Sequence, residues 1–179
     1  MQPIRHWKKR NFLHVIKLIR KLDMDIFIRS GTKEDVYGIA KLYFEGTGRI
    51  ISRPNLRIDL EDYPSAVAIS NGEIVGFAYL CHFSHGVVRL DNLYVRADMR
   101  SHGLGQKLMK HLEKHMPKQH QYMILDNSLK YEYPNGAPKK SARKFYERLG
   151  FETIVLIQDQ NGEDVTSVLL KKIKTATSN

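Results

Sequence analysis

The sequence predicts one domain of the α/β class, in which helices and strands alternate around a single core. Two apolar runs, 65–70 and 73–82, flank Asn71 and Gly72, a pair that favours the positive φ angles of a tight hairpin turn. Residues 103–116 instead carry leucines at helical spacing. The chain of 179 residues is 42% hydrophobic and 27% charged, the balance of a soluble globular protein large enough for one core.

The elements before the hairpin follow from the period of the apolar residues and from the residues that interrupt it. Residues 25–29 alternate as a first strand. Thr32 is typical of a helix N-cap, and Asp35 takes the acidic position of a capping box, so a helix should follow. Its apolar stripe consists of Val36, Ile39, Ala40 and Tyr43. The polar, glycine-containing stretch 45–63 predicts loop and a short helix.

The elements after the hairpin continue the alternation. In order, we expect a strand over 86–95, a helix over 103–116, a buried strand over 121–126, a helix over 140–149 that ends at Gly150, and two strands over 151–158 and 165–171. Asn161 and Gly162 predict a second hairpin turn between the last two strands.

The excess positive charge is concentrated at the beginning of the chain. The net charge is +10, and residues 1–23 hold seven Lys or Arg against Asp23. This segment is either an amphipathic basic helix for an anionic surface, a plain appendage, or the product of an early start codon before Met24. We therefore expect a basic extension over 1–23, one domain over 24–174 and a polar tail over 175–179.

Two further features concern the cellular compartment. No apolar run reaches the roughly 18–20 residues that cross a bilayer, so we expect no membrane span. Cys81 is the only cysteine, which excludes an intrachain disulfide, and the start of the chain lacks the apolar stretch of a secretory signal. These features favour a reducing cytoplasm.

The strand over 86–95 changes the parity of its apolar residues. The positions that lie out of phase are Val88 and Leu90, then Leu93 and Val95. A β-bulge at Asp91 or Asn92 would produce this shift, because one extra residue moves every later side chain to the other face. A regular strand with two polar residues facing solvent is the alternative.

A glycine-containing loop, Arg-Ser-His-Gly-Leu-Gly-Gln at 100–106, leads from this strand into the leucine-striped helix. Gly103 and Gly105 let the backbone turn tightly and approach a ligand, and the first turn of a helix offers unpaired N–H groups. Such a site favours phosphate or pyrophosphate. The loop matches neither the P-loop nor the dinucleotide fingerprint, whose third glycine is replaced by Leu108.

Three blocks of sequence resemble the GNAT superfamily of acetyl-CoA-dependent N-acetyltransferases. They are Leu-Asp-Asn-Leu-Tyr-Val at 90–95, the loop at 100–105, which fits the pattern Gln/Arg-x-x-Gly-x-Gly/Ala, and Ala-Arg-Lys-Phe-Tyr-Glu-Arg-Leu-Gly-Phe at 142–151. The resemblance covers residues 24–171. It implies an α/β (α+β) fold of three layers, with helices on both faces of a mixed, mostly antiparallel sheet of about six or seven strands that splays between strands 4 and 5.

The resemblance also implies where acetyl-CoA binds. Backbone groups of Leu93, Tyr94 and Val95 would hold the pantetheine amides and the acetyl carbonyl. The pyrophosphate would lie on Arg100, Ser101, His102, Gly103, Leu104, Gly105 and Gln106. Many members carry an Asn where this chain has Lys139. Either Asn135 substitutes for it from the same loop, or Lys139 contacts a phosphate of coenzyme A.

Two catalytic residues follow from the same resemblance. Asp91 stands where many members carry an acidic general base, and an amine with a pKa of about 10 must lose a proton before it attacks a carbonyl. Asp is one methylene shorter than the commoner Glu, which favours contact through a bridging water. Tyr146 aligns with the tyrosine that protonates the departing thiolate. A core aromatic is the alternative for Tyr146.

The sequence defines the residues that would bind the acceptor amine less clearly than those that would bind acetyl-CoA. The resemblance places four residues beside the acceptor, where acidic groups would favour a cationic amine: Asp59, Glu61, Asp62 and Tyr63. Solvated loop charges are the alternative for these residues. His111 and His115 lie one helical turn apart, but Glu113 does not complete H-E-x-x-H and no third ligand is evident, so we expect no metal.

We therefore expect an N-acetyltransferase that acts on a primary amine of a small molecule, peptide or protein by direct attack in a ternary complex. An acyl-CoA-binding regulatory module without catalysis is the alternative. Nucleic-acid binding through residues 1–23 ranks last, because that segment lacks interleaved aromatics or zinc-ligand spacing. Members of the superfamily frequently pair, so a homodimer stays open, and the sequence does not identify the acceptor.

Overall fold

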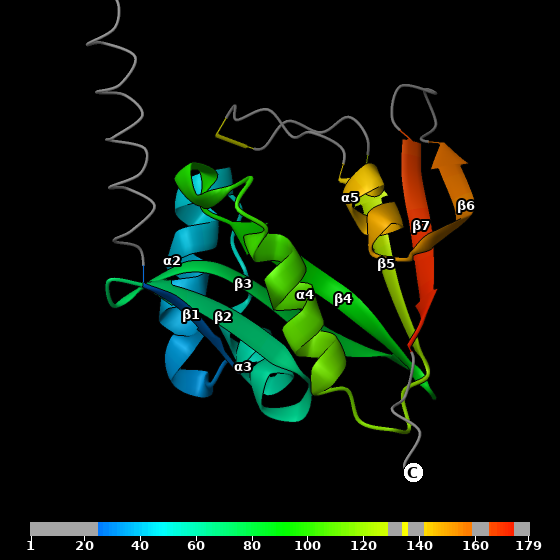
Figure 1. Ribbon diagram of the computed structural model, residues 1–179, viewed down its shortest axis with the longest axis horizontal. Helices are drawn as coiled ribbons and strands as arrows, with labels where there is room; N and C mark the ends of the chain where they lie inside the picture. Colours follow the sequence, from blue (N-terminus) through cyan, green and yellow to red (C-terminus); the bar gives the residue numbers. More distant parts are fainter. Residues whose placement is uncertain (1–24, 129–133, 136–141, 159–164, 174–179) are drawn as a thin grey trace, which may run out of the picture.

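The elements described here come from a computed structural model, which describes residues 25–128, 134–135, 142–158 and 165–173 (Figure 1). In chain order they are β1 (Ile26–Arg29), the 3-10 helix η1 (Lys33–Asp35), α2 (Val36–Thr47), α3 (Arg53–Asp62), β2 (Ser65–Ser70), β3 (Glu73–Ser84), β4 (Val87–Val95), the 3-10 helix η2 (Ala97–Met99), α4 (Leu104–Lys114), β5 (Tyr122–Ser128), α5 (Arg143–Arg148), β6 (Glu152–Gln158) and β7 (Val165–Lys172). No helix within these residues combines the length and apolarity that crossing a membrane requires.

The strands of the described residues form one sheet in the order β1-β2-β3-β4-β5-β7-β6. All neighbouring strands are antiparallel except β4 and β5, which run parallel. These two strands pair only between residues 87–89 and 122–124 and then diverge, as the directions of their ribbons show in Figure 1. The predicted mixed, mostly antiparallel sheet with a splay between strands 4 and 5 is confirmed.

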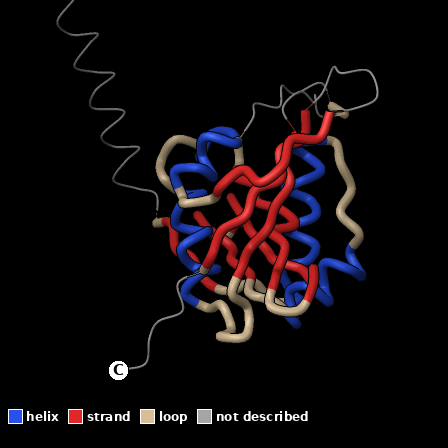
Figure 2. Tube along the Cα trace, turned by 90° about the vertical axis from the view of Figure 1, so that its right-hand side faces the viewer, coloured by secondary structure: helices blue, strands red, loops and turns tan. Residues whose placement is uncertain are grey.

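The sheet separates two apolar cores. On one face α4 contributes Leu104, Leu108 and Leu112, which pack with side chains of β4, β5, β7 and α5. On the other face α2 and α3 pack residues such as Ile39 and Leu56 against β2, β3 and β4. Figure 2 shows helices on both sides of the strands. The predicted three-layer arrangement is therefore confirmed.

The hairpin between β2 and β3 forms where the sequence predicts it. Asn71 and Gly72 connect the strands with φ angles of 52° and 79°, the left-handed values that a tight hairpin turn requires. The predicted cap also forms, since Thr32 precedes η1 and its backbone N–H donates to the Asp35 carboxylate at 2.8 Å. The turn chemistry and the cap were both readable from residue type alone.

The stretch 45–63 differs from the prediction. Residues 45–47 extend α2, and the predicted short helix is α3, which spans 10 residues and leaves little of the stretch as loop. Pro54 lies in its first turn, where a missing N–H removes no hydrogen bond, and Leu56 and Leu60 are buried four residues apart. The expectations for residues 1–23, Lys139, the turn at 161–162 and the tail at 175–179 lie outside the described residues.

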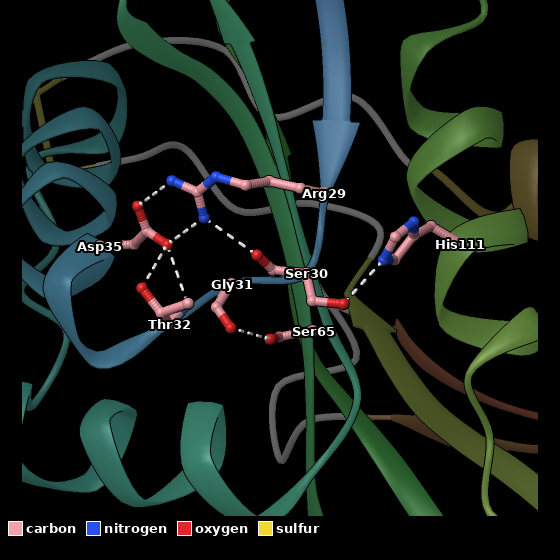
Figure 3. A network of polar contacts seen from close by, with 7 residues as sticks. All are labelled: Arg29, Ser30, Gly31, Thr32, Asp35, Ser65 and His111. Atoms are coloured by element: carbon pink, nitrogen blue, oxygen red, sulfur yellow. Dashed lines mark hydrogen bonds and ion pairs between the residues drawn. The ribbon is translucent and has the colours of Figure 1, made fainter.

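Polar contacts at the end of β1 link the two helical layers (Figure 3). Arg29 donates to both Asp35 oxygens, at 2.6 and 2.8 Å, and Ser30 Oγ lies 3.0 Å from His111 Nε2 on α4. The rings of His111 and His115 are 4.1 Å apart. Within the described residues no three metal-ligating side chains come together. The contact of His111 with Ser30 ties α4 to the segment directly after β1.

Candidate active site

The parity change in β4 is a β-bulge. Tyr79 of β3 pairs with Asn92 and Leu80 pairs with Leu90, which leaves Asp91 as the extra residue. Leu90 is buried in the core beneath α4, and Leu93 packs against the same core although three positions separate the two residues. The bulge is confirmed and its position is Asp91. As a result the side chains of Asp91 and Asn92 both line the pocket beside α3.

The backbone of β4 beyond the bulge faces the region that β5 has left. The Arg96 N–H donates to the Val75 carbonyl at 2.9 Å, so Arg96 points its backbone groups toward β3. Backbone groups of successive strand residues point to opposite edges. Leu93 and Val95 therefore direct their N–H and C=O groups toward the splayed edge, where an extended ligand would meet them.

The loop before α4 has an unusual backbone. Ser101 and Gly103 have φ angles of 67° and 72°. The left-handed conformation is strained at Ser101, because this residue, unlike glycine, has a Cβ atom. Both residues are exposed, and no atom lies within 4 Å of the position that a Gly103 Cβ would occupy. Arg100 folds back, with Nε donating to the Val95 carbonyl at 2.9 Å and its guanidinium 5.4 Å from the Tyr94 ring centre. The open loop and the first N–H groups of α4 together suit an anion.

Gly105 allows α4, α5 and β4 to meet at the splay. A Cβ atom on Gly105 would lie 3.2 Å from Phe145 Cζ and 3.8 Å from Leu93 Cδ2. Most side chains would therefore displace Phe145. The second glycine of the loop is explained by this contact with α5, whereas Gly103 is explained by its left-handed backbone.

Tyr146 is buried on α5 and packs in the core beneath α4. Its ring makes edge-to-face contacts with Phe145 and Phe151, at centroid distances of 5.1 and 5.7 Å. It stands on the β5 side of the splay and does not line the pocket that contains Asp91. Its packing accounts for the aromatic character of the position, and its hydroxyl stays a candidate for contact with the donor.

A pocket of about 490 Å³ lies between α3 and the bulged part of the sheet. It is lined by Tyr43, Arg49, Ile50, Ile51, Ser52, Asn55, Leu56, Ile58, Asp59, Tyr79, Cys81, His82, Arg89, Asp91 and Asn92. Asn55 and Asp59 are four residues apart on α3 and therefore share the face that borders the pocket. The bulge supplies the opposite wall, so the pocket adjoins the strand that leads to the splay.

The Asp91 carboxylate is held by several donors. The Tyr79 hydroxyl and Asn92 Nδ2 donate to Oδ2 at 2.8 and 3.0 Å, and Arg89 Nη2 donates to Oδ1 at 2.6 Å. Asn92 also donates to the Tyr79 hydroxyl at 2.9 Å. Burial and the Asp91 charge raise the pKa of Tyr79, so this phenol stays a proton donor. At the floor of the pocket, the side chains of Tyr79, Asn92 and Arg89 thus all donate to the Asp91 carboxylate.

Asp59 lies in the same pocket as Asp91, but its surroundings differ. The pKa of its carboxyl is raised from the ordinary 3.8 to about 6, mainly by burial and also by the charge of Asp91, while Arg89 partly opposes the shift. The other predicted acceptor-side residues lie elsewhere. Glu61 is exposed and faces Arg57, with 3.6 Å between Oε1 and Nε, Asp62 is exposed, and Tyr63 packs against the rings of His82 and His120. Of the four, only Asp59 lines the pocket.

Asn135 lies against the C-terminal end of α2. Its backbone nitrogen is 2.9 Å from the position of a Gly48 Cβ, and Gly48 has a φ of 72°. In Figure 1 this short piece of described chain lies at the end of the molecule where α4 begins. Lys139 falls outside the described residues, so the choice between these two residues remains an expectation.

Several residues of the pocket were not singled out from the sequence. They are Tyr79, Arg89 and Asn92, whose side chains hold Asp91, together with Cys81, whose thiol lies 3.8 Å from Asp91 Oδ1. Arg89 and Asp91 are two positions apart on a strand, which is a readable signal for a shared face. The pairing of Tyr79 with Asn92 depends on the register set by the bulge, which residue type alone does not specify.

The comparisons with known proteins agree with this arrangement. A family model described as "Acetyltransferase (GNAT) domain" matches residues 61–153, just over half of the chain. No curated protein matches the sequence.

Solved structures of acetyltransferases share the fold. The ribosomal-protein-S18-alanine N-acetyltransferase from Escherichia coli is 20% identical, with a TM-score of 0.65 over 86% of this chain and 97% of that one. A putative acetyltransferase from Salmonella typhimurium with its cofactor acetyl-CoA is 17% identical, with a TM-score of 0.64 over 87% and 98%. An aminoglycoside 6'-N-acetyltransferase complexed with coenzyme A is 16% identical, with a TM-score of 0.67 over 85% and 99%. At these identities the likeness concerns the fold.

Proposed function

The chain belongs to the GNAT acetyltransferase family, and on this basis we propose that it transfers an acetyl group from acetyl-CoA to a primary amine within a ternary complex. One observation carries the proposal. The strand that diverges from β5 also forms, at its bulge, one wall of a pocket of about 490 Å³. A donor in the splay and an acceptor in the pocket would therefore meet at the same strand.

The donor side uses backbone groups. Leu93, Tyr94 and Val95 would hold the amide arm, with Leu93 and Val95 facing the splay and the Val95 carbonyl also accepting from Arg100. The N–H near Leu93 would stabilise the charge that develops on the thioester oxygen, an effect of about 3–4 kcal/mol for a preorganised donor. Residues 100–106 would receive the pyrophosphate. Their open, left-handed backbone at Ser101 supports this role.

The acceptor side uses the pocket. Its carboxylates would attract a cationic amine, and its floor would hold the nitrogen beside β4. Tyr146 would donate a proton to the departing thiolate from the opposite side of the splay. Asp91 contributes the charge and the hydrogen-bonded network that shape the pocket. Asn135 and Lys139 are proposed as further contacts of coenzyme A.

The test has two steps. Calorimetric titration with acetyl-CoA measures donor binding, and a panel of primary amines is then followed by release of free thiol. The panel contains n-butylamine, spermidine, a peptide with a free N-terminus and an internal lysine peptide. Thiol release that depends on one amine, with the acetylated product seen by mass spectrometry, supports the proposal. Donor binding without thiol release for any amine would instead support a regulatory acyl-CoA-binding module.

A further inference from the structure

The two carboxylates of the pocket are not equivalent. Asp91 accepts hydrogen bonds from Tyr79, Asn92 and Arg89, and the last of these donors is a guanidinium at 2.6 Å. The bond to the guanidinium is charge-assisted. The oxygens of Asp91 are therefore largely directed at donors within the protein, which leaves little room for an incoming ammonium group.

Asp59 has the properties that Asp91 lacks. Its side chain is half-buried, it lines the pocket from α3, and among the described residues none donates a hydrogen bond to its carboxylate. A half-buried carboxylate without a donor is costly unless a partner arrives. The ammonium group of a substrate would be such a partner.

Given the acetyltransferase activity proposed above, we propose that Asp59, and not Asp91, receives the ammonium group of the acceptor and takes up its proton. Arg89, Tyr79 and Asn92 hold Asp91 in place, so that the pocket presents one carboxylate engaged by protein donors in its floor and one carboxylate without such donors in its wall. Because the pKa of Asp59 is about 6, the group is ionised at neutral pH yet more basic than an ordinary Asp.

The charged groups around Asp59 influence the pKa of its carboxyl. Besides Asp59, the charged and titratable groups that line the pocket are Asp91 and Arg89 from β4, Tyr79, Cys81 and His82 from β3, Tyr43 from α2, and Arg49 from the segment between α2 and α3. Asp62, on the same helix as Asp59, does not line the pocket but acts on Asp59 through its charge. Asp91 and Asp62 raise the pKa of Asp59, whereas Arg89 lowers it. A bound ammonium group would add a positive charge close to Asp59 and would lower this pKa again.

The mouth of the pocket indicates what the ammonium group is attached to. Ile50 and Ile58 line it with 86% and 54% of their surfaces exposed. Two exposed isoleucines beside a carboxylate suit a cation carried on a hydrocarbon chain, because the chain covers apolar surface while the charge reaches Asp59. The substrate class is therefore a primary alkylammonium.

The protons and bonds of the reaction balance in this arrangement. The ammonium group passes one proton to Asp59, which releases it to water, and the free amine attacks the thioester carbonyl. The new N–C bond forms and the C–S bond breaks. The nitrogen loses its second proton as the amide forms, and the departing thiolate takes up one proton from Tyr146, which is restored by that second proton.

The experiment measures kcat/KM between about pH 5 and 9 with the amine of the panel that gives the fastest thiol release. The wild type should show an ascending limb near pH 6 in addition to the titration of the amine itself. Asp59→Asn should lose this limb and about 100-fold in kcat/KM, and Asp59→Glu should restore part of both. Asp91→Asn should keep a limb even where its rate falls, moved to lower pH because the charge of Asp91 no longer raises the pKa of Asp59. Asp25→Asn, an exposed change directly before β1, should behave as wild type.

The outcomes separate this inference from the proposed function. Amine-dependent turnover with an unaltered limb in Asp59→Asn overturns the role of Asp59 and leaves the acetyltransferase intact. If no amine is acetylated, a binding measurement decides. Carbon-13 NMR follows the Asp59 carboxyl, assigned by its absence in Asp59→Asn, with n-butylammonium and with n-butanol as the uncharged control. A lower titration midpoint with n-butylammonium alone supports the inference, and an unchanged midpoint refutes it.

Discussion

Replacing Asp59 by Asn should stabilise the protein, and the gain should depend on pH. The pKa of this carboxyl is about 6 in the folded protein against the ordinary 3.8. At about 1.4 kcal/mol per pKa unit this corresponds to at most about 3 kcal/mol. Asp59 keeps contact with solvent, which screens its interactions, so we expect about 1 kcal/mol.

The sign follows from the order in which the two states lose their protons. A raised pKa in the folded state means that the unfolded chain releases its proton first as the pH rises, so the charged carboxylate favours unfolding. The penalty is absent below about pH 4, grows between pH 4 and 6, and is complete above about pH 6. Asn removes the charge and hence the penalty. The gain of Asp59→Asn should therefore be largest at neutral pH and about half as large at pH 5.

The assay is urea unfolding of the wild type, Asp59→Asn and Asp25→Asn at about pH 5 and about pH 7.5. Asp25 is exposed directly before β1, outside the pocket, and its substitution should change the free energy of unfolding by less than about 0.5 kcal/mol at either pH. A destabilised Asp59→Asn, or a gain that is equal at both pH values, would refute the reasoning. In either case Asp59 would have a partner in the folded protein that the contacts above do not include.

Further substitutions test the remaining parts of the site. Asp91→Asn and Tyr146→Phe should each lower turnover about tenfold or more while acetyl-CoA binding, measured by calorimetry, stays nearly unchanged; full activity would remove their proposed roles. Gly105→Val should destabilise the fold by about 1–3 kcal/mol in urea unfolding, because its side chain must displace Phe145, and a neutral effect would contradict the close contact. Gly103→Ala meets no atom within 4 Å and has only its left-handed φ of 72° to overcome, so we expect a loss of about 1 kcal/mol and a lower Tm; a gain would show that the backbone there is not left-handed.

Local signals in the sequence predicted the frame of the molecule. Asn71 and Gly72 specify their turn through backbone preferences that act within two residues, and the leucines of α4 specify a helix through their spacing. The parity change in β4 indicated either a bulge or a regular strand with two polar residues, and only the pairing with β3 decided for the bulge and identified Asp91 as the extra residue. Such signals can be interpreted from the sequence alone, because they depend on residues that are close together in the chain.

The candidate site was harder to predict from the sequence than the fold, because its residues come from elements that meet only in the folded protein. Asp91 was predicted from family resemblance, but its partners Tyr79 and Asn92 meet only once the register of β3 and β4 is known. Asp59 was grouped with Glu61 and Asp62, and only the orientation of α3 separates the one that lines the pocket from the two that do not. Three carboxylates within four positions look alike in a sequence, whereas their distances from Asp91 and from solvent differ.

The three-residue pairing of β4 with β5 has a consequence for how the molecule tolerates an opening in the middle of its sheet. An unpaired strand edge normally invites another chain to pair with it, which is a route to aggregation. Here the two inner edges converge on the pairs at 87–89 and 122–124, so the opening is a wedge with a closed base. A wedge of this shape would exclude a continuous peptide strand from passing through, whereas a thin amide-bearing chain, such as the proposed donor, would enter from the wide end and pair like a strand. The fold thereby keeps backbone groups available for recognition while withholding them from self-association.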